Sequence, residues 1–367
     1  MTATGTTESP GHMTVRACRT CGRSYPMWGL EVACTCGSPL SWAGAAECSS
    51  TAAGLWRHAD ILPPVSLSNR LTLGEVATPL IDVGRLRCKL DYMLPTGSFK
   101  DRGACVLASA ALESGVEHAV ADSSGNAGAA LAAYCAAGGL PLTVFVPKGT
   151  GSPKVAQIRR YGATVEEVDG DRAAVSAAAR RFAETSGAFY ASHAWSPFFL
   201  AGVRTVALEL VDALGDEIPG VVCPVGAGTL LLGLYQGFQV RLEQGRITRI
   251  PPLHGIQAAL VAPLAAAFAA GSDDVDADLH SGKSIAEGIN TATPPRAREI
   301  LAAVRASGGS ITAVREEEIV DAQEALARRG VLVEKTSAVA WAGALDLPAL
   351  PDGSVAVLTG SGLKEAA

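Results

Sequence analysis

From about residue 79 onward, short apolar runs alternate with Ala-rich stretches that have the length of helices. Apolar runs that end in turn residues predict buried strands, which we place at 118–124, 142–147, 164–169, 220–226, 254–258 and 354–360. The stretches between them predict helices at 99–113, 126–137, 152–161, 171–185, 198–214, 229–243, 316–329 and 337–346. Because this alternation is typical of mostly parallel sheets with right-handed crossovers, we predict an α/β protein.

The composition limits the partners of such a protein. With 367 residues, of which 48% are hydrophobic and 18% charged, the chain is long enough for two domains with sizeable cores. Its formal net charge of -6 makes nucleic acid and anionic membrane poor partners, so we expect a small-molecule ligand. No apolar run reaches the length of about 18 residues that a membrane span needs, and the first residues lack the basic and apolar blocks of a secretory signal. We expect a cytoplasmic protein.

Four of the nine cysteines lie close together near the N-terminus, in the pattern C-x2-C-x12-C-x-C. They are Cys18, Cys21, Cys34 and Cys36. Two C-x2-C pairs would be a strong zinc signal, but a C-x-C second pair closes a tighter ring, so a zinc-bound and a metal-free ribbon both stay open. Any zinc here would be structural, because four sulfur ligands leave no open position. The other cysteines are scattered singly, and no disulfide scaffold is expected.

Three Gly-rich loops follow predicted strands, where ligands of open α/β sheets bind. The loop SSGNAG, Ser123–Gly128, opens a helix with hydroxyl, amide and backbone N–H donors that suit a carboxylate or phenolate oxygen. The loop PVGAGTLLLG, 224–233, suits a phosphate, although it matches neither the dinucleotide pattern nor a P-loop. The loop TGSGLKE, 359–365, follows the last predicted strand. Each loop alone has an ordinary explanation, as an N-cap, a common turn or a frayed end.

The segment PTGSFKDRG, 95–103, places Lys100 between an aromatic ring and an acid, in a chain with 7 Lys and 23 Arg. A lone lysine at a helix start is most often a surface residue. A buried amine, however, loses its proton far more readily than a guanidinium does, so arginine could not replace it. One such lysine together with the three loops suits a single ligand that has an aldehyde, a phosphate and a ring.

These motifs resemble those of the fold-type II enzymes that use pyridoxal 5'-phosphate, and within them the threonine synthase branch. The resemblance runs from about Cys18 to the C-terminus, PTGSFKDRG is its most specific element, and the segments AEGI (286–289) and VEKTSA (333–338) also fit. It implies two open three-layer α/β domains with the cofactor between them, preceded by a small Cys-rich ribbon, and a homodimer. The implied boundaries are 1–45 for the tail and ribbon, 46–98 plus 206–367 for the large cofactor-binding domain, and 99–205 for a small mobile domain.

The resemblance also implies roles for individual residues. Lys100 would hold the cofactor as a Schiff base and then move protons at Cα and Cβ of the substrate, and Thr359 would donate to the pyridine nitrogen. A hydroxyl at that nitrogen favours β-elimination and replacement over transamination. Asn126 would bind the ring 3'-oxygen and, with Ser123 and Ser124, the substrate carboxylate. The phosphate would be wrapped by Val225, Gly226, Ala227, Gly228, Thr229 and Leu230.

One segment departs from the pattern of several threonine synthases. Aligned on Ser196-Pro197, the arginine expected to meet the substrate phosphate is Phe199 in this chain, and the following acid is Ala201. Phe199 and His193 are therefore candidate substrate-side residues, although His193 also suits an ordinary helix-entry turn. Arg204 and Lys154 are the candidates to replace the missing cation.

Three functions stay open on this basis. The leading one is threonine synthase, which converts O-phosphohomoserine and water to threonine and phosphate. The second is a β-elimination or β-replacement enzyme that acts on serine, threonine or O-phosphoserine. The third is a catalytically silent homologue that binds an amino acid or a protein, and Lys100 argues against it because mere binding needs no amine of depressed pKa.

Overall fold

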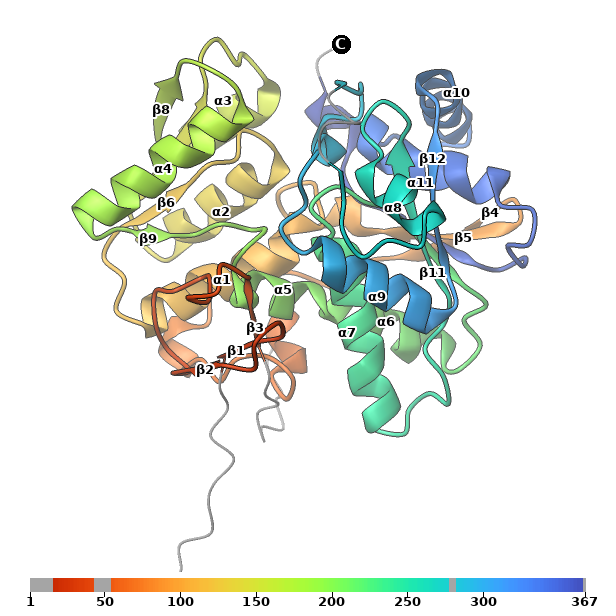
Figure 1. Ribbon diagram of the computed structural model, residues 1–367, viewed down its shortest axis with the longest axis horizontal. Coiled ribbons are helices and arrows are strands. Elements are labelled where there is room, and N and C mark those ends of the chain that lie inside the picture. The colour runs from red at the N-terminus through yellow and green to blue at the C-terminus, as the bar shows by residue number, and fades with distance from the viewer. Residues whose placement is uncertain (1–15, 43–53, 277–281, 366–367) are drawn as a thin grey trace, which may run out of the picture.

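The computed structural model describes residues 16–42, 54–276 and 282–365, which form three sheets and the helices around them (Figure 1). One sheet has six strands, one has four and one has three. The prediction of two open α/β sheets with a small N-terminal ribbon is confirmed. The expected polar tail before residue 12, the end of the predicted 1–45 segment and Cys48 lie outside the described residues.

The six-stranded sheet contains the last strands of the chain and one early hairpin. Its strand order is β12-β11-β10-β13-β5-β4, and every neighbouring pair is parallel except β4 with β5. The strands are β4 (Leu80–Val83), β5 (Leu86–Leu90), β10 (Val221–Pro224), β11 (Leu253–Ala258), β12 (Ser310–Val314) and β13 (Val355–Leu358).

Successive residues of this sheet enter two different cores, as a pleated strand requires. Val221 and Cys223 of β10 belong to the larger core, which contains buried residues of α7 (Thr229–Glu243), α8 (Pro263–Ala269) and α9 (Ala297–Ser307). Val222, between them, belongs to the core that contains α10 (Glu316–Ala327) and α11 (Lys335–Asp346). Helices therefore cover both faces, which gives three layers.

The four-stranded sheet is parallel, with the order β8-β7-β6-β9. Val120 packs with residues of α4, whereas Ala119 and Ala121 share the larger core with α1 and α2. The strands are β6 (Ala119–Ala121), β7 (Leu142–Pro147), β8 (Thr164–Val168) and β9 (Phe189–Tyr190), and the helices are α1 (Lys100–Glu113), α2 (Asn126–Ala137), α3 (Pro153–Arg160) and α4 (Arg172–Ser186). The whole sheet lies inside the range 99–205. The division into domains and the homodimer stay predictions.

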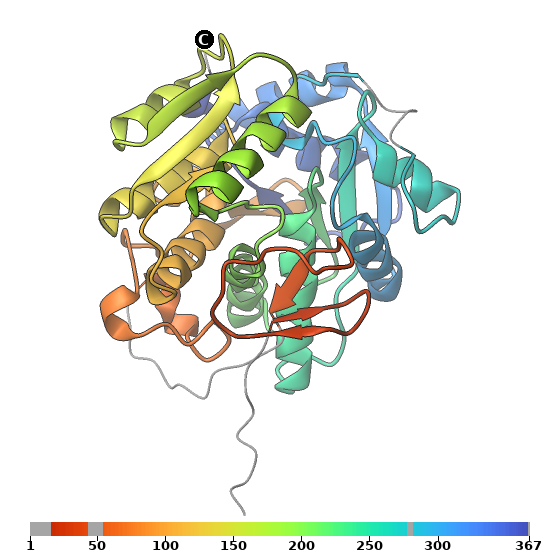
Figure 2. The same ribbon diagram turned by 60° about the vertical axis from the view of Figure 1, so that its left-hand side comes forward.

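The N-terminal ribbon is a three-stranded antiparallel sheet that lies beside α5 (Pro197–Val203) in both views (Figures 1 and 2). Its strands are β1 (Arg16–Cys18), β2 (Ser24–Tyr25) and β3 (Leu40–Trp42), in the order β2-β1-β3. Short 3-10 helices occur at Gly54–His58, Leu67–Asn69, Asp91–Met93, Glu287–Ile289 and Gly362–Lys364. The ribbon is thus placed against the helix that follows the His193 segment.

The predicted single helix over 198–214 is wrong, because the chain forms α5 and then α6 (Thr205–Leu214), with Arg204 between them. The Thr205 hydroxyl donates to the Gly202 carbonyl over 2.8 Å, and the Ala207 N–H bonds to Arg204 O, three residues back rather than four. This tighter turn separates the two helices.

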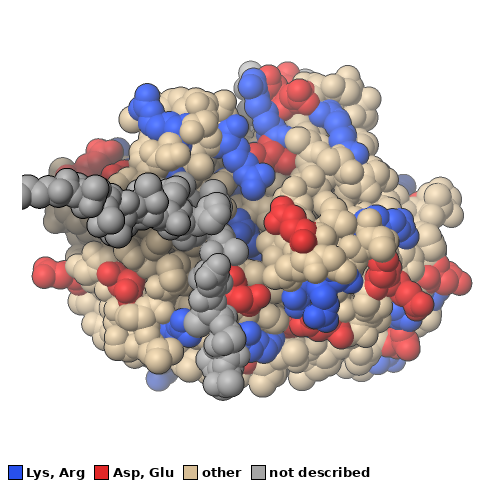
Figure 3. Space-filling view, turned by 90° about the horizontal axis from the view of Figure 1, so that it is seen from below, with Lys and Arg blue, Asp and Glu red and all other residues tan. Residues whose placement is uncertain are grey.

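The molecular surface in Figure 3 carries interspersed acidic and basic side chains over the face shown there. This mixture agrees with the modest net charge of -6. None of the described helices combines the length and apolar character that a membrane span requires.

A buried network of ion pairs connects the start of α1 to β5 and α6. Arg102 is fully buried, and its guanidinium lies 2.8 Å from Asp91 Oδ2 and 2.7 Å from Glu209 Oε1. The Lys89 ammonium lies 2.6 Å from the other oxygen of Glu209. Arg57, which is partly exposed, also pairs with Glu209. Asp91 and Glu209 are thus held by cations, and removal of the buried Arg102 leaves Asp91 without its ion pair.

We predict that Arg102→Met lowers the free energy of unfolding by about 3–5 kcal/mol, because Asp91 and Glu209 then lose their shared partner. Chemical denaturation measures this change. Arg298→Met is the matched control, because its ion pair with Asp274 is exposed on both sides and should contribute less than about 1 kcal/mol. Equal effects of the two substitutions would contradict the prediction.

Candidate active site

The loop that contains Lys100 lies beside the turn that follows β13. The Phe99 N–H donates to Thr359 O over 2.9 Å, and the Ser361 N–H donates to Gly97 O over 3.0 Å. Ser98 and Gly360 form a bridge between these two bonds. The structure therefore brings the PTGSFKDRG segment next to the TGSGLKE loop, although the two are widely separated in the sequence.

Asp101 holds the turn before Lys100. Its two carboxylate oxygens accept from the Thr96 N–H at 2.7 Å and the Thr96 hydroxyl at 2.5 Å. Burial raises the pKa of Asp101 to about 7, and these two hydrogen bonds oppose the rise. Gly97 has a φ of +83°, a conformation that few other residues adopt. The backbone on which Lys100 is mounted is thus set by its own neighbours.

The Lys100 ammonium lies between two aromatic rings, 4.2 Å from the centroid of Phe99 and 5.9 Å from that of Phe199. Loss of solvent lowers the pKa of Lys100 to about 8, and the negative charge of Glu334 opposes this shift. An amine with such a pKa is partly unprotonated near neutral pH, so it can act as a nucleophile or a base.

The SSGNAG loop joins β6 to α2, and Asn126 is the first residue of that helix. The Asn126 amide donates to both oxygens of Glu334, at 2.9 and 3.0 Å, while its own Oδ1 is buried with no hydrogen-bond partner among the described residues. Gly128 is required here, because a Cβ would lie 1.9 Å from Ser123 O. Ser123 and Ser124 are half-buried in the same loop. The loop thus offers an unsatisfied acceptor and several donors.

The PVGAGT loop joins β10 to α7. Within the described ranges, the N–H groups of Gly226, Ala227 and Gly228 donate to no protein acceptor, and they precede the first turn of α7. Gly228 has a φ of +80°, and a Cβ there would lie 2.1 Å from Ile300 Cδ1. At Gly226 a Cβ would lie 2.7 Å from Ile289 Cα. Unpaired N–H groups at a helix start form an anion-binding nest that suits a phosphate.

Thr359 lies at the end of β13, where Ser337 fixes it. The two hydroxyl oxygens are 3.0 Å apart, and Ser337 Oγ accepts from the N–H groups of Thr359 and Gly360, at 2.9 and 2.7 Å. Both side chains are buried. The next residue back, Thr336, accepts from the Gly288 N–H at 3.1 Å and so connects this turn to the loop that packs on Gly226.

Sequence reasoning missed Ser337 and Glu334 as site residues. Both lie in VEKTSA, a segment that the resemblance singled out as a whole. Glu334 contacts Asn126, and it is the acid whose charge acts on Lys100. The signal that could have indicated them is the occurrence of an acid, Glu334, close to the hydroxyl residues Thr336 and Ser337 in that segment.

His193 and Phe199 lie together near Lys100. Their rings meet edge to face with centroids 5.9 Å apart, and both line a small cavity together with Ser123 and Asp122. Burial, followed by the positive charge of Lys100, lowers the pKa of His193 to about 3, so the ring is neutral at physiological pH. Phe199 is fixed by Gly103, where a Cβ would lie 2.5 Å from the ring.

The two cations considered as replacements for the missing arginine lie in different places. Arg204 donates to Gln236 and to Trp42 O, both at 2.9 Å, so it contacts the ribbon and does not replace the arginine. Lys154 is buried, and its ammonium lies 3.3 Å from Glu334 Oε2. Lys154 therefore lies beside the acid that also contacts Asn126.

Residues 71–362 match the family described as pyridoxal-phosphate-dependent enzyme. The chain belongs to this family. Threonine synthase of Methanocaldococcus jannaschii is 33% identical over 96% of this chain and 93% of its own length. Threonine synthase of Mycobacterium tuberculosis is 31% identical over 84% of this chain and 87% of its own length.

Solved structures agree on the fold. A T.th. threonine deaminase superposes with a TM-score of 0.68 and 26% identity, over 80% of this chain and 94% of that one. Maize serine racemase superposes with a TM-score of 0.66 over 78% of this chain and 88% of that one, and its identity of 22% shows the fold alone. The fold is therefore that of fold-type II enzymes.

Enzymes of this family use pyridoxal phosphate, and the residues present suit it. The free N–H groups of the nest at 226–228 suit a phosphate, and the unpartnered Asn126 Oδ1 with its neighbours suits a polar substituent on a ring. The Lys100 amine, with its lowered pKa, suits condensation with an aldehyde. The chemistry of the donor set thus corresponds to each end of the cofactor.

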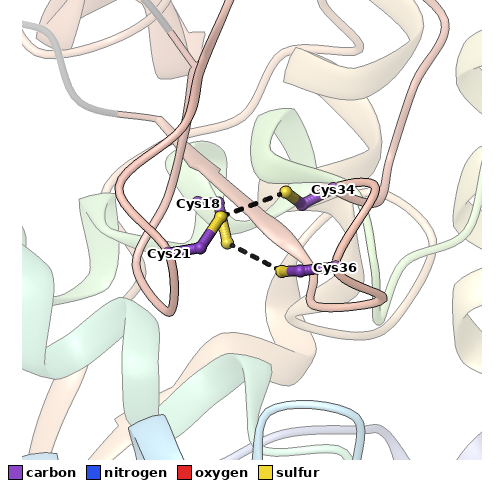
Figure 4. A group of neighbouring side chains, drawn as sticks. All are labelled: Cys18, Cys21, Cys34 and Cys36. Atoms are coloured by element: carbon purple, nitrogen blue, oxygen red, sulfur yellow. Dashed lines mark hydrogen bonds between the residues drawn. The ribbon is translucent and has the colours of Figure 1, made fainter.

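The cysteines of the ribbon form a compact group (Figure 4). The four sulfur atoms lie within 4.8 Å of one another, and the Cys18–Cys36 and Cys21–Cys34 sulfurs are each 3.5 Å apart. Tetrahedral zinc with sulfur ligands at about 2.3 Å needs sulfurs about 3.8 Å apart. The arrangement fits such an ion.

We predict that Gly228→Ala weakens the binding of pyridoxal phosphate by at least about tenfold, because the new Cβ collides with Ile300 and distorts the nest. Fluorescence titration of the cofactor-free protein measures the affinity. Gly245→Ala is the control, since Gly245 also has a positive φ but has open space around it. Unchanged affinity in Gly228→Ala would place the phosphate elsewhere.

We predict that the rate of covalent attachment of pyridoxal phosphate to the cofactor-free protein rises with pH and levels off above a midpoint near the Lys100 pKa of about 8. The reason is that only the unprotonated amine reacts with an aldehyde. Glu334→Gln should move the midpoint to lower pH, because it removes the charge that raises this pKa. Stopped-flow absorbance at pH values from about 6 to about 10 follows the reaction, and a midpoint near the ordinary lysine pKa would contradict the prediction.

Proposed function

We propose that this protein is a pyridoxal-phosphate-dependent lyase of small amino acids, and specifically a threonine synthase that converts O-phosphohomoserine and water to threonine and phosphate. The observation that carries the proposal is the 33% identity to a threonine synthase over nearly the full length of both chains. Lys154 would supply the cation that a phosphorylated substrate requires.

The residues of the site would hold the cofactor as follows. Lys100 would attach its aldehyde, Asn126 would lie at the ring oxygen, and Thr359, oriented by Ser337, would donate to the ring nitrogen. The phosphate would be bound by the nest at 226–228 and surrounded by the rest of the loop, which comprises Val225, Gly226, Ala227, Gly228, Thr229 and Leu230. When bound, the cofactor supplies a ring that stabilises negative charge at the substrate Cα.

Lys100 is the base of the proposed reaction. Its depressed pKa allows it to take a proton from the substrate Cα and to return it later, from one fixed position at the start of α1. Glu334 keeps this pKa from falling further, so the amine retains the ability to bind a proton. Lys100 thus serves as both attachment point and acid–base group.

The substrate is held from two sides in this proposal. Ser123, Ser124 and the start of α2 donate to its α-carboxylate, because a helix N-terminus favours an anion. Lys154 faces the leaving phosphate, and Phe199 with the neutral His193 forms the apolar wall of the site. An apolar wall limits the access of bulk water, while the reaction itself consumes one water molecule that adds at the substrate Cβ.

The second candidate function is β-elimination on serine or threonine. Two observations favour it: Phe199 stands where an arginine would meet a phosphate, and the T.th. threonine deaminase shares the fold with 26% identity. The two functions differ in the need for a cation opposite the substrate side chain.

We also propose that the four cysteines of the ribbon bind a structural zinc ion. The compact geometry of their sulfur atoms supports this assignment. With all four positions filled by sulfur, the ion would take no part in the chemistry.

We predict that the protein loaded with pyridoxal phosphate releases phosphate from O-phosphohomoserine and forms threonine. The test offers O-phosphohomoserine, O-phosphoserine, serine and threonine separately and follows phosphate, threonine and 2-oxoacid. Turnover of serine or threonine to a 2-oxoacid, with no phosphate released from O-phosphohomoserine, would reject threonine synthase and support the second candidate.

We predict that Lys154→Met lowers kcat/KM for O-phosphohomoserine by at least about tenfold and changes that for unphosphorylated substrates much less, because it removes the cation opposite the phosphate. Steady-state kinetics with both substrate types measure the difference. Lys148→Met is the control, since Lys148 is exposed and pairs with Asp169 on the surface. A loss that is equal for both substrate types would assign Lys154 to the cofactor or the fold instead.

A further inference from the structure

Two buried arginines, Arg204 and Arg296, donate hydrogen bonds to backbone carbonyls of the ribbon strand β3. Arg296, just before α9, donates from one nitrogen to Leu40 O at 2.7 Å and to Trp195 O at 2.9 Å, and from Nε to Ala194 O at 3.2 Å. Its charge is balanced by Glu299 at 2.9 Å. A single guanidinium thus connects three parts of the chain: the ribbon, the large-sheet side and the segment that follows His193.

The ribbon also encloses Phe198, the neighbour of Phe199. Trp28 stacks on Phe198 with centroids 5.8 Å apart and an interplanar angle of 27°, and Trp42 lies 6.3 Å away. The Arg16 guanidinium lies 5.9 Å from the same ring. The ribbon therefore contacts the substrate-side segment directly at Phe198, and it is linked to the backbone just after His193 through Arg296.

The ribbon has little core of its own. Its separate cluster of buried residues contains Cys18, Cys34 and Leu40, with Tyr25 packed against it. A core of this size does not stabilise a sheet without a staple, and a metal ion bound by four thiolates provides one. Leu40 packs against two of the proposed ligands and also accepts the hydrogen bond from Arg296. The sulfur cluster and the Ala194–Trp195 turn are thus linked through two residues, Leu40 and Arg296.

We propose that a soft divalent ion such as zinc, bound by Cys18, Cys21, Cys34 and Cys36, fixes strand β3 and that β3, through Arg296, positions the segment 193–199 beside the active site. Arg296 is a positioning residue, since it contacts backbone carbonyls and not the substrate. The inference rests on the proposed function in two respects: it takes His193 and Phe199 as substrate-side residues, and it uses the zinc ion proposed there for the ribbon.

Hydrogen exchange of the full-length, cofactor-loaded protein tests the inference without any need for turnover. Cys36→Ser, which alters an exposed ligand, should lose zinc, measured by metal analysis, and speed amide exchange in residues 192–203 by at least about tenfold. Exchange in α2 and the absorbance of the bound cofactor should not change. Wild-type protein that binds no zinc, or a zinc-free variant with unchanged exchange in 192–203, would overturn the proposal.

Arg296→Lys carries the test if Cys36→Ser fails to fold. It should keep zinc and cofactor, yet show the same faster exchange in 192–203, because a lysine cannot reach three carbonyls at once. It should also weaken binding of O-phosphohomoserine or threonine, followed by the cofactor absorbance, by about tenfold. Arg298→Lys on the exposed side of α9 is the control. Unchanged exchange in Arg296→Lys would contradict the proposal. If both variants show the faster exchange in 192–203 but the wild-type protein does not turn over O-phosphohomoserine, the result would count only against the proposed function.

Discussion

Three consecutive charged residues begin α1, of which Asp101 and Arg102 are buried and Lys100 is partly buried, and this loss of solvent is the constraint on which the site depends. Arg102 is neutralised by Asp91 and Glu209, and Asp101 accepts two hydrogen bonds from Thr96. The Lys100 ammonium faces the rings of Phe99 and Phe199, and the negative charge of Glu334 favours its protonated form. Burial is costly for an unpaired charge, so the loss of solvent lowers the pKa of Lys100, whereas Arg102 keeps its charge through its ion pairs and the two hydrogen bonds of Asp101 offset part of its cost of burial.

Glu334 connects this amine to the rest of the site. It accepts from Asn126 and pairs with Lys154, and it begins the helix whose first turn contains Ser337. The residues proposed to bind the cofactor ring, the substrate phosphate and the pyridine nitrogen are therefore in contact with one another through α11. A change at Glu334 should consequently alter several functions at once.

The sequence predicted those parts of the site that depend on local signals. Gly-rich turns at strand ends identify the loops around Asn126 and Gly228, and α2 has the predicted bounds, because turn chemistry and helix periodicity act over a few residues. The two-residue strand β9 is too short to show any periodicity, and it was missed. The partners of Arg296 lie 101 and 256 residues away, and no local pattern indicates such contacts. Arg204 was a candidate to replace the missing arginine, and its contact with Trp42 O, 162 residues away, could not be foreseen for the same reason.

The central claim is that Lys100 is the one amine that condenses with pyridoxal phosphate. Borohydride reduction of the loaded protein, followed by peptide mapping, tests it most directly, because reduction makes the bond permanent. We expect a single label on Lys100. A label on another lysine, such as the buried Lys89, Lys154 and Lys364, or no label at all, would contradict the account.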